Sequence, residues 1–194
     1  MYSYIKFADT LSSSMGKAFS WCIVILMGGT CYEVIMAYAF NAPTLWNFDF
    51  SLQMYGAIFM MAGAYTLATE AHVRGDVIYR LFPTKVQGWI DLILYFIFFF
   101  PGVLALAVTG FKYAARSVRY GEVSINSPAG IPIFQFKAII VLAGVLLVIQ
   151  GIAQVLRCVH CMRHGSWYET KETDEVEETE VILKRQQQQP SREQ

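Results

Sequence analysis

The sequence predicts an all-α integral membrane protein with four transmembrane helices and a short interfacial amphipathic helix. Hydrophobic residues make up 55% of the 194 residues and charged residues 15%, with a mean hydropathy of +0.40. Soluble domains are less apolar and carry more charge. The apolar residues gather in four stretches, each close to the roughly 20 residues that cross a bilayer core of about 30 Å.

These stretches place the spans at about residues 17–40, 51–69, 88–112 and 131–157. They form a predicted membrane domain over residues 1–168, and no remaining segment is long enough for a second folded domain. The first stretch is expected to be retained, because its apolar run exceeds that of a signal peptide and no small-residue cleavage pattern follows it. The final segment, 169–194, is acidic and then Gln-rich, which predicts a disordered tail.

The positions of Lys and Arg predict that both termini are cytoplasmic. With four spans, the side of the termini carries seven such residues: Lys6, Lys17, Arg74, Arg80, Lys85, Arg157 and Arg163. The opposite side carries four: Lys112, Arg116, Arg119 and Lys137. Positive residues favour the cytoplasmic side, and Trp46 and Trp89 lie where interfacial anchors are expected. The formal net charge is zero, so no basic field points to nucleic acid as a partner.

Small residues in the second and fourth spans predict helix–helix contacts. Helices in lipid associate through close van der Waals packing, which small side chains permit. We therefore expect a partner interface at Gly56, Gly63, Ala64, Gly144 and Gly151. In the third span, Pro101 follows an aromatic run and should kink the helix.

Polar residues near the first span allow fewer conclusions. Asp9, Thr10 and Ser12 suit an interfacial start and a helix cap. Glu33 is an acid in the outer half of the span, and an acid at membrane depth is a site hypothesis by default. The simpler alternative is that Glu33 is solvated or paired near the outer interface.

The segment from Thr69 to Gly88 predicts a structural turn followed by the interfacial helix. His72, Arg74 and Asp76 form the turn, and apolar residues at spacings of three and four follow until Pro83. The alternative is a solvated loop whose charges only set the topology. On the other side of the membrane, Glu122, Ser124 and Asn126 belong to a short polar loop that we expect to be ordered against the helices.

Cysteine and histidine residues near the end of the fourth span raise the question of a metal or redox site. Cys158, Cys161 and His164 follow one another within seven residues, whereas structural zinc sites usually combine two separated pairs of ligands. On a helix the two cysteines share a face, which fits small packing residues or a palmitoylation site. We expect no metal and no cofactor on this chain.

Three other functions fit the sequence less well. A disulfide-forming oxidase needs a reactive cysteine pair at the oxidising side, and a haem-bearing anchor needs histidines within the spans. A transporter that acts alone needs interrupted helices or an internal repeat, which the sequence lacks. No catalytic triad, phosphate-binding loop or paired carboxylates are apparent, so an enzyme is not expected.

Several short motifs occur in an order typical of one transporter family. They are Phe40-Asn41-Ala42-Pro43-Thr44-Leu45-Trp46 with Asp49, Ala62-Gly63-Ala64-Tyr65-Thr66-Leu67, His72-Val73-Arg74-Gly75-Asp76, Trp89-Ile90-Asp91, Gly121-Glu122-Val123-Ser124, Asn126-Ser127-Pro128-Ala129-Gly130 with Pro132, and Gln150-Gly151. Over roughly residues 10–160 the chain resembles the small permease subunit of tripartite ATP-independent periplasmic (TRAP) transporters, the DctQ-like family. One departure is Ala37, where many relatives carry an arginine.

The resemblance implies a role shared among three proteins in the bacterial inner membrane and periplasm. A periplasmic substrate-binding protein delivers an organic acid to a large permease subunit, which carries the substrate and sodium sites and moves like an elevator. The small subunit braces the stationary scaffold in the lipid bilayer. The alternative that we keep open is a membrane anchor or assembly subunit of an enzyme complex.

Overall fold

The computed structural model describes residues 2–69, 82–126 and 128–165, and every regular element in these ranges is helical. The elements are α1 (Tyr2–Ser20), α2 (Cys22–Tyr38), α3 (Asn47–Ala68), α5 (Thr84–Leu94), the π-helix η1 (Tyr95–Phe99), α6 (Phe100–Tyr120) and α7 (Phe134–His164). The predicted all-α class is therefore confirmed. The predicted turn at His72, Arg74 and Asp76, the interfacial helix after it and the C-terminal tail lie outside the described residues.

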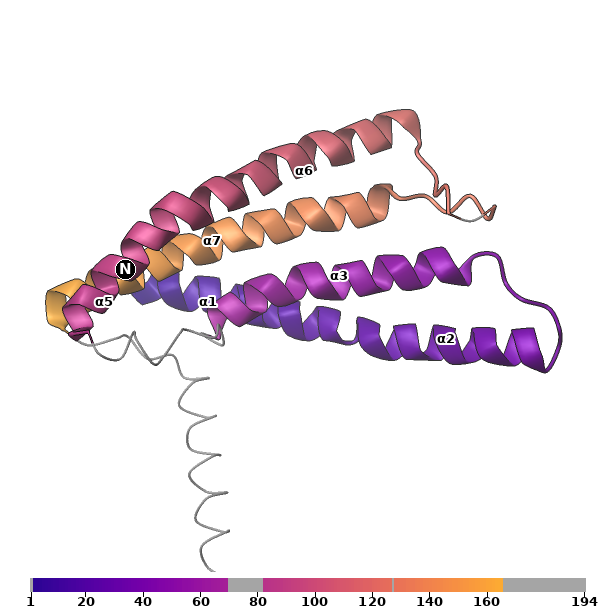
Figure 1. The fold of residues 1–194 in the computed structure, drawn as a ribbon, viewed down its shortest axis with the longest axis horizontal. Helices are drawn as coiled ribbons and strands as arrows, with labels where there is room; N and C mark the ends of the chain where they lie inside the picture. The colour runs from indigo at the N-terminus through magenta and orange to yellow at the C-terminus, as the bar shows by residue number, and fades with distance from the viewer. Residues whose placement is uncertain (1, 70–81, 127, 166–194) are drawn as a thin grey trace, which may run out of the picture.

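The helices form an elongated bundle with two distinct ends (Figure 1). The N-terminus, the last turn of α3, the start of α5 and the last turn of α7 lie at one end, which we call the terminal end (Figure 1). The α2–α3 and α6–α7 connections lie at the other end, which we call the loop end. Consequently α3 and α7 run in the same direction, whereas α2 and α6 run in the opposite one.

Within the described residues, three helical stretches are long and apolar enough to cross a membrane: Tyr2–Tyr38, Thr84–Tyr120 and Phe134–His164. Helix α3 is not among them, so the predicted count of four spans is not confirmed. Its first two turns carry Asn47, Asp49 and Gln53. The apolar part that remains, residues 54–68, covers only about 22 Å at 1.5 Å per residue.

The first helix begins much earlier than the span predicted at 17–40. α1 and α2 follow one another with a single non-helical residue, Trp21, between them. The predicted helix cap is wrong, since Asp9 and Ser12 lie in the middle of α1 and are buried. Their spacing with Ile5 and Ala8 places all four on one face of an amphipathic helix, which packs against α3 and α7.

Small residues permit close packing at the centre of the bundle. Ala64 of α3 and Ala143 of α7 are buried together with Met61 and Leu146. At Gly144, a Cβ atom would lie 3.2 Å from the Cα of Ala107 in α6, which shows how closely these two helices approach.

The five small residues predicted to contact a partner subunit differ in their surroundings. Gly56 faces the Phe136 ring and Gly151 faces the Phe99 ring, so these two, with Gly144 and Ala64, contact other helices of the same chain. Gly63 has open space where a Cβ would lie. A contact of any of the five with a partner stays a prediction, and Gly63 is the position with room for one.

The third long stretch departs from α-helical geometry just before its proline. η1 is a π-helical turn over Tyr95–Phe99, and Pro101 follows in the first turn of α6. Proline lacks the amide hydrogen that an α-helix needs, and a π-turn is one of the known ways for a helix to adjust. The structure therefore has a wider helical turn directly before the proline, and the kink expected at Pro101 stays a prediction.

Candidate functional site: two polar clusters at opposite ends of the bundle

Two groups of polar side chains, most of them buried, link helices and loops of the described chain. The terminal cluster consists of Asp9, Ser12, Gln150, Gln154 and Arg157. The loop cluster consists of Asp49, Tyr113, Glu122, Ser124 and Lys137. Because most of their members are buried, each group must satisfy its own hydrogen-bonding needs within the protein.

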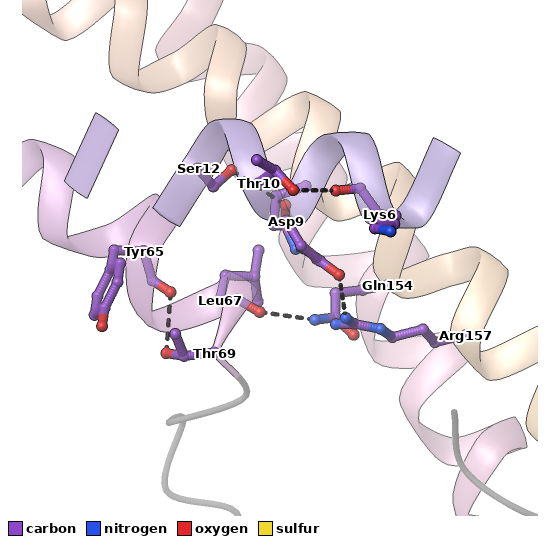
Figure 2. Close-up of polar contacts among 10 residues, drawn as sticks. Lys6, Asp9, Thr10, Ser12, Tyr65, Leu67, Thr69, Gln154 and Arg157 are labelled. Atoms are coloured by element: carbon purple, nitrogen blue, oxygen red, sulfur yellow. Dashed lines mark hydrogen bonds and ion pairs between the residues drawn. The ribbon is translucent and has the colours of Figure 1, made fainter. Parts of the chain in front are cut away.

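In the terminal cluster, the Asp9 carboxylate joins α1 to α7 (Figure 2). One oxygen accepts a hydrogen bond from Arg157 Nη2 at 2.7 Å, and the other accepts one from Gln150 Nε2 at 2.8 Å. Ser12 donates in turn to Gln150 Oε1 at 3.1 Å. Arg157 and Gln150 are both 0% exposed, so this is a buried, charge-assisted network.

Gln154 extends this cluster to a third helix. Its Nε2 donates at 2.7 Å to the carbonyl of Leu67, in the last turn of α3, where the helix leaves its carbonyls without intrahelical partners (Figure 2). Gln150, Gln154 and Arg157 are spaced by four and three residues, which places them on one face of α7. The cluster therefore ties α1, α3 and α7 together at the terminal end.

In the loop cluster, the α6–α7 connection is held against α3 and α7. Ser124 donates to Asp49 Oδ1 at 2.6 Å, and its backbone pairs with Ile131, whose carbonyl accepts the Ser124 amide at 2.8 Å. Asn126 donates its amide to Ser124 Oγ at 3.2 Å. The three loop residues predicted to be ordered against the helices, Glu122, Ser124 and Asn126, all take part in this arrangement.

Lys137 is the cation of the loop cluster. Its ammonium forms an ion pair with Glu122 and lies 3.7 Å from the centroid of the Tyr113 ring. The hydrogen bond from Lys137 holds the pKa of the Glu122 carboxyl below its ordinary range. A cavity of about 200 Å³ adjoins the cluster and is lined by Asp49, Tyr113 and Lys137 among others. Both charged groups that line it already have partners in the α6–α7 connection, since Asp49 accepts a hydrogen bond from Ser124 and Lys137 pairs with Glu122.

Glu33 has a structural partner near the loop end. Its carboxylate accepts a hydrogen bond from the Thr44 amide at 3.0 Å and another from the Thr44 hydroxyl. These bonds fasten the α2–α3 connection back onto α2. Of the two readings of Glu33, this contact supports the paired one.

Cys158 and Cys161 pack where α7 meets α5. Both are buried, Cys161 Sγ contacts the Thr84 carbonyl at 3.4 Å, and Gly88 lies against this face. His160 and His164 stack on each other with ring centroids 4.3 Å apart. Within residues 2–69, 82–126 and 128–165, no group of three His, Cys, Asp or Glu residues has the arrangement of a metal site.

The charge pattern of the sequence did not reveal the terminal cluster. Arg157 was interpreted as one of the cations that set the topology, and Asp9 was interpreted as a helix cap. Two signals do mark it in the sequence. Gln150, Gln154 and Arg157 repeat on one face of an otherwise apolar span, and polar groups in a span usually face protein. Asp9 and Ser12 also share a face with Ile5 and Ala8.

Comparison with known proteins places most of the chain in one family. The family model for tripartite ATP-independent periplasmic transporters, DctQ component, matches residues 26–161, which is more than two thirds of the chain. The match includes the whole loop cluster and the α7 residues of the terminal cluster, whereas Asp9 and Ser12 precede it. A comparison with curated proteins finds no significant match. The chain belongs to the DctQ family, the small membrane components of TRAP transporters.

Proposed function

We propose that this subunit braces the large permease subunit of a sodium-coupled, binding-protein-dependent importer of an organic acid. Family membership supplies the transporter class. The bracing role is supported by two observations: the polar clusters are used within the chain, and apolar side chains are exposed on its surface. Both polar clusters hold the chain's own helices and loops together, and the cavity beside the loop cluster has a volume of only about 200 Å³.

The observation that carries the proposal is the exposed apolar surface of α2. None of the residues in Cys22–Tyr38 is buried, although most are hydrophobic. Ile23, Met27 and Ile35 are each more than half exposed. A helix of this kind is stable only in contact with lipid or another membrane protein, and α2 adds such a surface beside α3.

The same proposal includes the topology. α3 would act as a fourth span, short enough that its polar first turns lie at the interface beside the α6–α7 loop. Both termini would then be on the cytoplasmic side of the bacterial inner membrane, together with Lys6, Lys85 and Arg163. The large permease subunit and the periplasmic binding protein are the expected partners, and sodium binds on the large subunit.

Co-purification and reconstitution test this proposal. The tagged full chain, expressed with the neighbouring reading frames of its operon, should bring down a large multi-span protein in mild detergent. The reconstituted complex should import an organic acid only with its binding protein and an inward sodium gradient. Recovery of this chain alone would contradict the bracing role. Recovery with haem absorbance or a soluble catalytic subunit would assign it to an enzyme complex instead.

A further inference from the structure

The outer face of α6 changes character along its length. The buried residues Val103, Gly110, Ala114 and Ser117 mark the face that packs against α7. On the helical wheel, Lys112, Arg116 and Arg119 lie within a narrow arc directly opposite that face. Val108 and Leu104, one and two turns before Lys112, are about half exposed and lie on the flank of the same side. An apolar strip therefore leads into a basic stripe, which we define as Lys112, Arg116 and Arg119.

The three cations have no partner of their own in the described parts of the chain. All three side chains are exposed, and no hydrogen bond or ion pair with a described residue engages them. Arg116 is near enough to Glu122 to affect that carboxyl electrostatically, but Lys137 holds the carboxylate. Three like charges within two helical turns repel one another unless an anion lies among them.

The stripe borders a hollow with room for an anionic group. The hollow has a volume of about 610 Å³ and is lined by Phe111, Lys112, Ala115, Arg116, Arg119 and Tyr120. Two arginines one helical turn apart present forked donors that match phosphate oxygens. The aromatic residues at both ends of the hollow suit the membrane interface.

The position along the helix places this hollow at the depth of lipid headgroups. With Trp89 at one interface, a rise of 1.5 Å per residue puts Lys112 about 35 Å away and Arg119 about 45 Å away. The hydrocarbon core is about 30 Å thick, and headgroups extend the bilayer to about 40–45 Å. Lys112 thus lies near the edge of the hydrocarbon, and the two arginines lie at the level of the phosphates.

We propose that the basic stripe binds the headgroup of one anionic phospholipid in the leaflet at the loop end. The phosphate would lie between Arg116 and Arg119, with an acyl chain along Val108 and Leu104. An acidic surface of a soluble protein fits less well, because such a protein cannot follow the site into the hydrocarbon. The proposal requires α6 to span the membrane but does not depend on the bracing role, so either can fail alone.

Native mass spectrometry of the full chain in a nonionic detergent tests this site. Phosphatidylglycerol should form a discrete one-to-one adduct, and phosphatidylcholine of the same chain length should bind about tenfold more weakly or less. The variant R116Q/R119Q should lose at least about tenfold in phosphatidylglycerol affinity. The matched control K6Q/K85Q removes two exposed cations at the terminal end and should leave the affinity unchanged. Equal losses in both variants, or equal binding of both lipids, would overturn the proposal.

Two further measurements separate the lipid from other phosphate sources. Inorganic phosphate at millimolar concentration should not displace the lipid, whereas displacement would show a site for free phosphate and overturn the proposal. The variant V108N keeps the basic stripe and should weaken phosphatidylglycerol binding, because it removes apolar contact along the acyl chain. If R116Q/R119Q instead releases a partner protein and retains the lipid, the stripe is a protein interface.

Discussion

The terminal cluster and the loop cluster both contain an ion pair, but the two pairs differ in burial and in the elements that they connect. In the terminal cluster, Arg157 and Asp9 come from two helices and their side chains are 0% and 10% exposed. In the loop cluster, Lys137 is similarly buried, whereas the Glu122 side chain is 33% exposed and belongs to a connection. The first cluster therefore links helices to one another, whereas the second holds one loop against the helices, and we expect the first to matter more for helix assembly.

The largest effect is expected from Arg157→Ala, since it leaves the Asp9 carboxylate buried without its cation. Removing one partner of a buried pair costs about 3–5 kcal/mol. Thermal unfolding of the purified chain in detergent should show this loss, and Arg163→Ala, which removes an exposed cation of the same helix, should show almost none. The double variant Asp9→Leu with Arg157→Met should recover much of the stability, because both charges are gone. A double variant as unstable as the single one would refute this account.

The packing beside the terminal cluster gives the next largest effect. Gly151 follows Gln150, and a larger side chain there meets the Phe99 ring, so Gly151→Leu should destabilise the chain by about 1–3 kcal/mol. Gly63→Leu enters open space and should leave the unfolding temperature unchanged. If a partner helix packs at Gly63, this variant should instead lower the yield of the complex. An unchanged yield would show that this face meets lipid.

The loop cluster should be less sensitive to loss of its cation. Lys137→Gln removes the ion pair with Glu122 and the contact with Tyr113, and we expect a loss of about 1–3 kcal/mol, between the values for exposed and buried pairs. Lys85→Gln, which removes an exposed cation outside both clusters and outside the basic stripe, is the control and should leave the unfolding temperature unchanged. A loss from Lys137→Gln as large as that from Arg157→Ala would erase the difference between the two clusters.

The smallest effect is the response of the loop cluster to pH. The folded protein lowers the pKa of Glu122, so the unfolded state takes up a proton first as the pH falls. The stability that this carboxylate contributes is therefore present above its unfolded pKa of about 4.3 and is lost as the pH falls through the lower folded value. At pH 7 the wild type should unfold at a higher temperature than Glu122→Gln, and this difference should become smaller at pH 3.5. A constant difference between the two proteins would contradict this assignment.

The sequence was sufficient to predict the helical class and the family, because both depend on local patterns. The order of Glu122, Ser124 and Asn126 in a polar loop predicted an ordered connection, and the structure adds their partners Asp49 and Lys137. These partners lie 75 and 15 residues away, and no local pattern indicates such pairings. The start of α1 was predicted too late for a related reason. Asp9 and Ser12 resemble a helix cap in the sequence, and their partners in α7 are distant along the chain.

The span count shows a limit of another kind. Hydropathy averages over all sides of a helix, whereas α3 carries polar residues that lie against the loop and small residues that lie against α7. Asp49 lowers the apolar character of the first turns and yet is only 2% exposed. A buried polar residue such as Asp49 can thus lower the mean hydropathy of a helix without being exposed to solvent.

The pairing of Asp9 with Arg157 also constrains the order of events during synthesis. The two residues are separated by 148 positions, so α1 leaves the ribosome long before its partner helix exists. At 5–20 residues per second, that interval lasts about 7–30 s. During this time the Asp9 carboxylate has no cation to meet it in a low-dielectric interior, and its hydration favours keeping α1 at the membrane surface. Helix α1 is therefore expected to dock only after α7 has been made.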